Sequence, residues 1–126
     1  MPALFSSLKL PMSATDFSSL NLSAEQLTVL DSLGYKQMTA VQAQSLPLIL
    51  QGKDLIAQAK TGSGKTAAFG IGLLQTIQPD FFAVQALIIC PTRELADQVG
   101  KELRRLGRGI PNLKLVMLCG GKPLGP

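Results

Sequence analysis

The sequence of 126 residues contains no histidine. Imidazole is the usual base beside a serine or cysteine nucleophile and the commonest metal ligand, so its absence excludes histidine-activated nucleophiles and imidazole metal sites. The two cysteines, Cys90 and Cys119, each end an apolar run, and their spacing matches no metal motif. We therefore expect two buried, reduced thiols with no metal-binding role.

Long apolar runs and a leader sequence are also absent. No run reaches the about 18 apolar residues of a membrane span, and the first twenty residues lack a basic stretch followed by an apolar one. We expect a cytoplasmic protein without membrane contact; the sequence says nothing of its oligomeric state. Translation could begin at Met1 or at Met12, and residues 1–16 are predicted to form a flexible extension.

Acidic residues are scarce in one half of the chain. Residues 81–126 hold seven basic and three acidic residues, whereas residues 1–80 hold five of each. A basic half favours a polyanionic partner such as a nucleic acid. Lys101, Arg105 and Arg108 share one face of a predicted helix, which is either a solvated face or a nucleic-acid contact.

The strongest motif that is present is Ala59–Thr66, with the sequence Ala-Lys-Thr-Gly-Ser-Gly-Lys-Thr. It lies between an apolar run, Leu55–Ala57, and a helix-like run, which is the layout of a phosphate-binding P-loop. Lys65 would reach the terminal phosphates and the Thr66 hydroxyl would ligate Mg²⁺. Ala59 stands where the strict motif has glycine. The alternative is a Gly/Ser turn that precedes a lysine by chance.

Strand-like and helix-like segments alternate along the chain. Capping-box patterns and apolar spacing predict helices from Ser23 to Gly34 and from Thr39 to near Leu50, and Pro47 should kink or divide the second. Further helices are predicted over 66–77 and 93–106, and strands over 55–57, 84–90 and 113–119. The sequence therefore predicts an α/β fold with a parallel sheet of three readable strands flanked by helices.

In such a sheet, the loops after the strands meet at one edge. Besides the P-loop, these are Pro91-Thr92-Arg93 and Gly120-Gly121. Arg93 in the first turn of a helix could hold a phosphate of a polymer backbone, although Thr92 could equally be an ordinary helix cap. The glycine pair allows a close backbone approach or is a plain turn.

Together these motifs resemble the first RecA-like domain of DEAD-box ATP-dependent RNA helicases. Ala59–Thr66 matches motif I of that family, which accepts alanine at its first position; Pro91–Ala96 matches motif Ia, and Gly120-Gly121 matches the GG motif. Gly34–Gln42 resembles the Q motif, with Phe17 seventeen residues upstream of Gly34. The similarity, to one bacterial member in particular, divides the chain into an extension, 1–16, a partial RecA-like domain, 17–121, and a truncated tail, 122–126.

The resemblance implies ATP and Mg²⁺ as cofactors and RNA as partner, gripped by its backbone and therefore independently of sequence. It implies a helicase of the ribosome-assembly type. Gln42 would read the adenine edge, and Phe17 would stack on the base. Met38 and Ala40 replace two common prolines of the Q motif, so adenine selectivity could be looser. The implied cofactor residues are Phe17, Gln42, Ala59, Lys60, Thr61, Gly62, Ser63, Gly64, Lys65 and Thr66, with Thr66 on the metal; the implied RNA contacts are Pro91, Thr92, Arg93, Gly120 and Gly121.

Three parts of the family pattern are missing from the sequence. It contains no Asp-Glu-Ala-Asp motif, no Ser-Ala-Thr motif and no second domain, so we assign no catalytic residue. Without a carboxylate to orient the attacking water, we expect weak or no ATPase activity, no helicase activity and poor stability of this chain alone. The alternatives are a non-catalytic ATP- or RNA-binding fragment or gene relic, and, less in keeping with Pro91–Ala96, a small P-loop kinase or transport ATPase.

Overall fold

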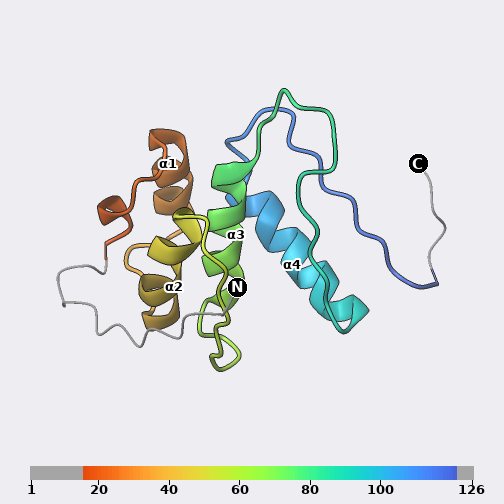
Figure 1. Ribbon diagram of the computed structural model, residues 1–126, viewed down its shortest axis with the longest axis horizontal. Coiled ribbons are helices and arrows are strands. Elements are labelled where there is room, and N and C mark those ends of the chain that lie inside the picture. The colour runs from red at the N-terminus through yellow and green to blue at the C-terminus, as the bar shows by residue number, and fades with distance from the viewer. Residues whose placement is uncertain (1–15, 122–126) are drawn as a thin grey trace.

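The computed structural model describes residues 16–121, which form a layer of helices joined by extended segments (Figure 1). In that view α1 and α2 lie on one side, α3 is central, and α4 lies on the other side. Among these residues, no helix is long and apolar enough to span a membrane. The elements are η1 (Phe17–Ser19), α1 (Ala24–Ser32), α2 (Ala40–Leu50), α3 (Lys65–Thr76) and α4 (Arg93–Leu106).

Hydroxyl caps set the starts of three helices. The Ser23, Thr39 and Thr92 side chains each accept a hydrogen bond from the backbone N–H three residues on. Thr39 forms the full capping box that its sequence predicts. At Ser23 only half of the predicted box forms, because the Gln26 amide instead donates to the Leu106 carbonyl at 3.1 Å. Gln26 thus ties α1 to the end of α4.

The core lies where α3 packs between α2 and α4. Leu46, Ile71 and Leu106 have no exposed surface there. Gly72 of α3 leaves no room for a Cβ beside Ile49, so a glycine permits the close approach of α2 and α3. Six of the residues of α3, including Ala67, Ile71 and Leu74, are buried, so other parts of the chain cover this helix on most sides.

The expectation was that Pro47 kinks or divides α2; the helix runs through Pro47 without interruption, so Pro47 does not divide it. Proline removes one backbone donor and costs about 3 kcal/mol in a helix interior. The residues beside it are buried or half-buried against α3, including Leu46 and Ile49. We attribute the intact helix to this packing, because tertiary burial supplies most helix stability.

The three predicted strands are not formed: residues 16–121 contain no strand, and their isolated β-bridge joins Asp16 to Gln37. Segments 55–57, 84–90 and 113–119 share no backbone hydrogen bond with one another in this part of the chain. A strand exists only as part of a ladder, so an extended segment without a paired neighbour is not one. The apolar composition of the three segments indicated extended backbone, but it could not show whether each segment has a hydrogen-bonded neighbour.

The chain ends fall largely outside the described residues. Of the predicted extension, 1–16, only Asp16 is described, where it caps η1. The start at Met1 or Met12 and the tail, 122–126, lie outside the described part. Cys90 and Cys119 are free but half-buried, so the prediction of buried thiols is only partly met.

Candidate functional site

The turn before α3 has the backbone of an anion cradle. Gly62 and Gly64 adopt left-handed conformations, with φ of 83° and 90°, and the Ser63 N–H donates to the Lys60 carbonyl at 3.1 Å. Gly64 is the N-cap of α3 and provides no side-chain cap. The first amides of α3 therefore lack a capping side chain, and the positive end of the helix dipole lies at the same place.

Lys65 closes this turn. Its ammonium donates to the Ala59 carbonyl at 2.5 Å, across the loop from the start of α3. An ammonium has three donors, so two remain for an anion. Thr66 follows at the second position of α3.

The hydroxyl oxygen of Ser63 is buried and has no hydrogen-bond partner among residues 16–121. An unsatisfied buried polar group costs about 1–3 kcal/mol, which a bound phosphate could offset by accepting its proton. The described residues contain no group of three or more His, Cys, Asp or Glu side chains that could hold a metal by itself. Mg²⁺ usually keeps waters and substrate phosphates as ligands, so a single Thr66 hydroxyl fits a nucleotide-borne Mg²⁺. The residues present therefore fit a magnesium–nucleotide ligand.

Gln42 lies against the phosphate loop. Its amide oxygen accepts from the Thr39 N–H at 2.9 Å, and its amide nitrogen donates to the Gly64 carbonyl at 3.2 Å. The side chain is 1% exposed, and a Cβ on Gly64 would collide with it. The fold thus brings together the two motifs that sequence reasoning assigned to one ligand, from positions 22 residues apart.

Phe17 lies in the core, 3% exposed, and its ring meets the Tyr35 ring edge-on with the centroids 6.1 Å apart. The Tyr35 hydroxyl donates to the Glu102 carboxylate of α4. Burial, with the hydrogen bond to Glu102, raises the pKa of Tyr35 to about 12. This anchor between the Gln42 segment and α4 was missed, because no local pattern links residues 67 positions apart. The stacking of Phe17 on a base stays a prediction.

The second and third predicted loops meet at the start of α4. The Arg93 guanidinium donates to the Gly120 carbonyl at 2.9 Å, and a Cβ on Gly121 would stand 3.0 Å from it. Thr92 caps α4 by accepting from the Leu95 N–H at 3.1 Å. Arg93 has five N–H donors, so this rim keeps several for an anion. Pro91, Thr92, Arg93, Gly120 and Gly121 are all outside the core, as a contact surface for a polymer requires.

The phosphate loop and this rim are separate within residues 16–121: no hydrogen bond joins Ala59–Thr66 to either Arg93 or Gly120. Each of the three basic residues at the end of α4 and just beyond it has a partner within the described residues. Lys101 pairs with Asp97 and Arg105 with Glu102, each at 2.9 Å, and Arg108 donates to Ser32. A role of these three residues in nucleic-acid contact stays a prediction.

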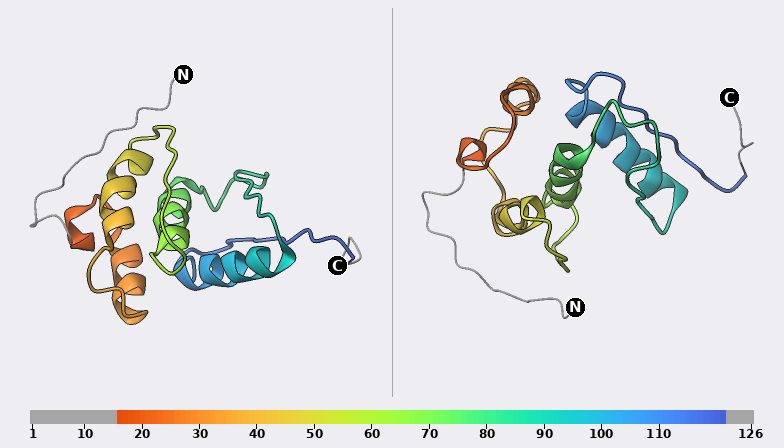
Figure 2. Two further views of the ribbon diagram at one scale, coloured as in Figure 1. Left: turned by 90° about the horizontal axis from the view of Figure 1, so that it is seen from below. Right: turned by 45° about the horizontal axis from the view of Figure 1, so that its top comes forward.

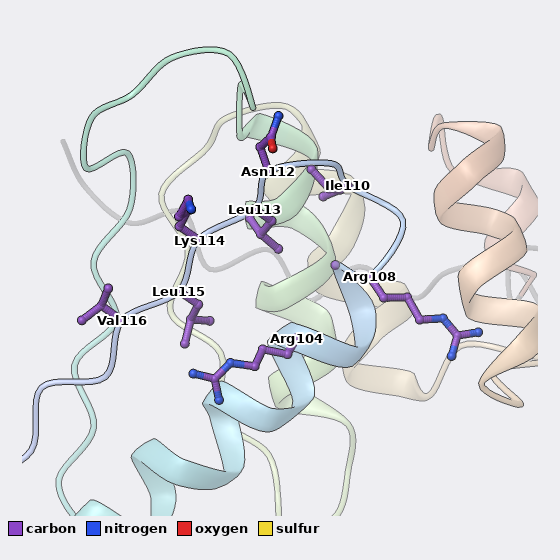
Figure 3. A pocket seen from close by; sticks show the side chains of 9 residues that line it. Arg104, Arg108, Ile110, Asn112, Leu113, Lys114, Leu115 and Val116 are labelled. Carbon is purple, nitrogen blue, oxygen red and sulfur yellow. The ribbon is translucent and has the colours of Figure 1, made fainter. Parts of the chain in front are cut away.

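A hollow of about 510 Å³ lies away from the predicted site residues, between the end of α4 and the segment 112–116 (Figure 3). The Arg108 side chain turns away from it toward α1, whereas Leu113 and Leu115 point toward the helices. Arg104 and Lys114 add positive charge at its border. Of its lining residues only Arg108 was considered as a ligand contact in the sequence analysis, as one of three basic residues that could contact a nucleic acid.

Comparison with known proteins gives a consistent result. The model of the DEAD/DEAH box helicase family matches residues 39–125. Over 112 residues, 88% of the chain, it is 64% identical to the ATP-dependent RNA helicase DbpA of Escherichia coli K12, and it is 44% identical over 109 residues to the helicase CshA of Bacillus subtilis. The chain spans 24% and 22% of these relatives, about a quarter of their length. The expected similarity to one bacterial member is confirmed.

Solved structures agree. A DEAD box protein from the hyperthermophile Methanococcus jannaschii is 40% identical, with a TM-score of 0.82 over 86% of this chain and 30% of that chain. Dbp5 of Saccharomyces cerevisiae, bound to RNA and ADP BeF3, is 33% identical with a TM-score of 0.73 over 76% of this chain and 25% of its own. The RecA-like fold class is thus supported by its neighbours, although the three strands are not.

Proposed function

Since the chain belongs to the DEAD/DEAH box helicase family, we propose that it is the nucleotide- and RNA-binding part of an ATP-dependent RNA helicase. The observation that carries the proposal is the hydrogen bond from the Gln42 amide to the Gly64 carbonyl at 3.2 Å. It holds a side chain capable of recognising a base against a loop capable of holding phosphates. A chance Gly/Ser turn gives no reason for this arrangement.

The ligand of this site is ATP with Mg²⁺. The turn from Ala59 to Gly64 and the first amides of α3 hold the phosphates, Lys65 neutralises them, and Thr66 ligates the metal. Gln42 uses one amide proton and one oxygen lone pair within the protein, so it retains one of each. That remaining pair matches the donor and acceptor on the exposed edge of adenine. Phe17 is proposed to stack on the adenine base.

The partner is RNA, held at the rim formed by Pro91, Thr92, Arg93, Gly120 and Gly121. Arg93 and backbone amides bind phosphate and sugar rather than base edges, so binding at this rim does not depend on sequence. A solved relative, Dbp5, is itself bound to RNA and ADP BeF3. The excess of basic residues beyond residue 80 favours the same partner.

Binding by this chain does not extend to turnover. The sequence contains no Asp-Glu-Ala-Asp motif, and no other carboxylate is assigned to orient an attacking water. The residues of this sequence are therefore assigned to binding, and none of them is assigned to hydrolysis or strand separation. RNA-stimulated ATP turnover by the purified 126-residue chain would contradict this.

The test is a titration of the chain with fluorescent ATP and GTP analogues in Mg²⁺. We expect the wild type to bind ATP more tightly than GTP. Lys65→Ala should lower nucleotide affinity at least about tenfold, since a charged hydrogen bond contributes about 1.5–3 kcal/mol. Gln42→Ala should abolish the preference for ATP over GTP. Gln44→Ala on the exposed side of α2 and Lys114→Ala are the matched controls. Equal affinity for both nucleotides in the wild type, or unchanged binding by Lys65→Ala, would sink the proposal; circular dichroism confirms that each variant remains folded.

A further inference from the structure

Tyr35 lies between the two residues that are proposed to recognise adenine. Its ring meets the Phe17 ring edge-on, with the centroids 6.1 Å apart. It also begins the segment 35–39, and the N–H of Thr39 at the end of this segment donates to the Gln42 amide oxygen at 2.9 Å. A change in the position of Tyr35 would therefore displace both Phe17 and Gln42.

The backbone of the segment 35–39 is tied to the start of η1. An isolated β-bridge joins Gln37 to Asp16, and Asp16 directly precedes Phe17. The bridge therefore holds η1 beside the segment that leads to Gln42. Whatever fixes this segment in the fold also fixes the spacing of Phe17 and Gln42.

The hydroxyl of Tyr35 attaches this unit to α4. It donates to one carboxylate oxygen of Glu102, and the other oxygen accepts from the Arg105 guanidinium at 2.9 Å. The Glu102 side chain is only 19% exposed, so its hydrogen bonds are partly shielded from competing water. In both views of Figure 2, η1 and α4 lie on opposite sides of α2 and α3. The contacts from Phe17 through Tyr35 to Glu102 therefore join the two ends of the helix layer.

We propose that the Tyr35–Glu102 hydrogen bond positions the adenine-recognising residues, so that Tyr35 and Glu102 set the preference for adenine over guanine. They act as positioning residues, through Phe17 and Gln42. An amide that reads a base edge must be held within about 0.5 Å of the productive geometry, because hydrogen bonds weaken steeply with misalignment. The inference rests on the proposed function, since it concerns the base-recognising half of the same site.

Phosphate binding should not depend on this link. Within residues 16–121 no hydrogen bond joins Lys65 to Tyr35 or to Glu102. The glycine turn before α3 takes its shape from Gly62 and Gly64, whose backbones are left-handed. Base discrimination and phosphate affinity can therefore be separated by experiment.

The test measures the affinity of the full 126-residue chain, in Mg²⁺, for fluorescent ATP and GTP analogues and for inorganic triphosphate, which has no base. Tyr35→Phe removes only the hydroxyl and keeps the ring that packs on Phe17. We expect it to lower the ratio of ATP to GTP affinity at least about threefold, because it removes the hydrogen bond that positions the base-reading groups. The affinity for inorganic triphosphate should stay that of the wild type.

Substitutions of Glu102 test the other end of the hydrogen bond. Glu102→Leu should lower the ratio as Tyr35→Phe does, and the double variant should lose no more than either single variant, since both remove the same contact. Glu102→Gln should retain the preference, because its amide oxygen still accepts from the hydroxyl. Glu25→Leu, which removes a carboxylate from an exposed position of α1, is the matched control. Circular dichroism confirms folding, and Tyr35→Phe decides the outcome if Glu102→Leu does not fold.

The outcomes separate this inference from the proposed function. A wild type that prefers ATP, together with an unchanged ATP-to-GTP ratio in Tyr35→Phe, would overturn the inference alone. So would a loss of affinity for all three ligands to the same extent, because the link would then serve stability only. A wild type that binds ATP and GTP equally would contradict the proposed function and this inference with it.

Discussion

The helix layer and the extended segments of this protein are both rich in apolar residues, yet one is packed and the other open. Leu46, Ile71 and Leu106 of the helices are fully buried, whereas Val84, Leu87 and Ile89 are 79–90% exposed. An α-helix satisfies its own backbone hydrogen bonds and needs a neighbour on one side only. A strand in a layered fold needs a partner beside it and covering layers on both faces. Helices can therefore pack in this structure although strands do not form among the described residues.

The two regions should differ most in the stability that each loses when one of its side chains is truncated. Leu106→Ala should lower the free energy of unfolding by about 2–5 kcal/mol, because it leaves a cavity between α3 and α4. Val116→Ala removes a side chain that is 79% exposed and should change it by less than about 0.5 kcal/mol. Urea unfolding followed by circular dichroism measures both. Equal losses would mean that the segment 113–119 is packed in solution.

A second comparison is between alanine substitutions at the two glycines before α3. Gly62 and Gly64 both have positive φ, so alanine is strained at either position by about 1–2 kcal/mol. At Gly64 a Cβ would also strike the Gln42 amide, whereas at Gly62 it would meet open space. Gly64→Ala should therefore reduce nucleotide affinity and stability more than Gly62→Ala does. Identical affinities in a nucleotide titration of the two variants would show that the Gln42–Gly64 contact is unimportant.

Removing the side-chain hydrogen bond that joins α1 to α4 should have a smaller effect on stability. Gln26→Leu keeps a buried side chain but removes the donor to the Leu106 carbonyl, which should cost about 1–3 kcal/mol. The matched control is Gln44→Leu, at an exposed position of α2 that makes no such contact. Urea unfolding checks the difference. If the two variants unfold alike, the helix layer does not depend on this bond.

The smallest expected effect is the loss of stability at alkaline pH when Tyr35 titrates. The pKa of Tyr35 is raised to about 12 by burial and by its hydrogen bond to Glu102. The folded state thus prefers the neutral phenol, so this contribution to stability is complete below pH 10 and is lost as the pH rises from about 10 to 12. Tyr35 is the only tyrosine and there is no tryptophan, so absorbance at 295 nm follows its titration directly. Titration near 10, or an unchanged alkaline loss of stability in Tyr35→Phe, would contradict the Glu102 contact.

The helices were predictable because their signals are local. Thr92 and Thr39 cap the helices that their sequences indicate, and α4 runs from Arg93 to Leu106 as predicted. The hydrogen-bond partner of the Gln26 side chain could not be predicted. Its spacing from Ser23 fits a capping box, but the buried Leu106 carbonyl, 80 residues away, takes the amide instead.

The candidate site divides in the same way. The glycine turn within Ala59–Thr66 could be predicted because consecutive residues set its backbone, and phosphate binding by this turn stays a prediction. The pairing of Arg93 with the Gly120 carbonyl fits the expectation that their loops meet, but its geometry was not readable from the sequence. The Tyr35–Glu102 anchor had no sequence signal, since a hydrogen bond between distant helices leaves no spacing pattern.

The sequence by itself determined the approximate helix boundaries, the glycine turn before α3 and the family, because caps, glycine turns and consecutive motifs act over a few residues. Only the tertiary structure decided that Gln42 rests on Gly64, that Pro47 does not divide α2, and that 55–57, 84–90 and 113–119 remain unpaired. The physical reason is the range of the interactions. A helix is closed by its own hydrogen bonds, whereas a buried amide or a strand is completed only by groups brought from elsewhere in the fold.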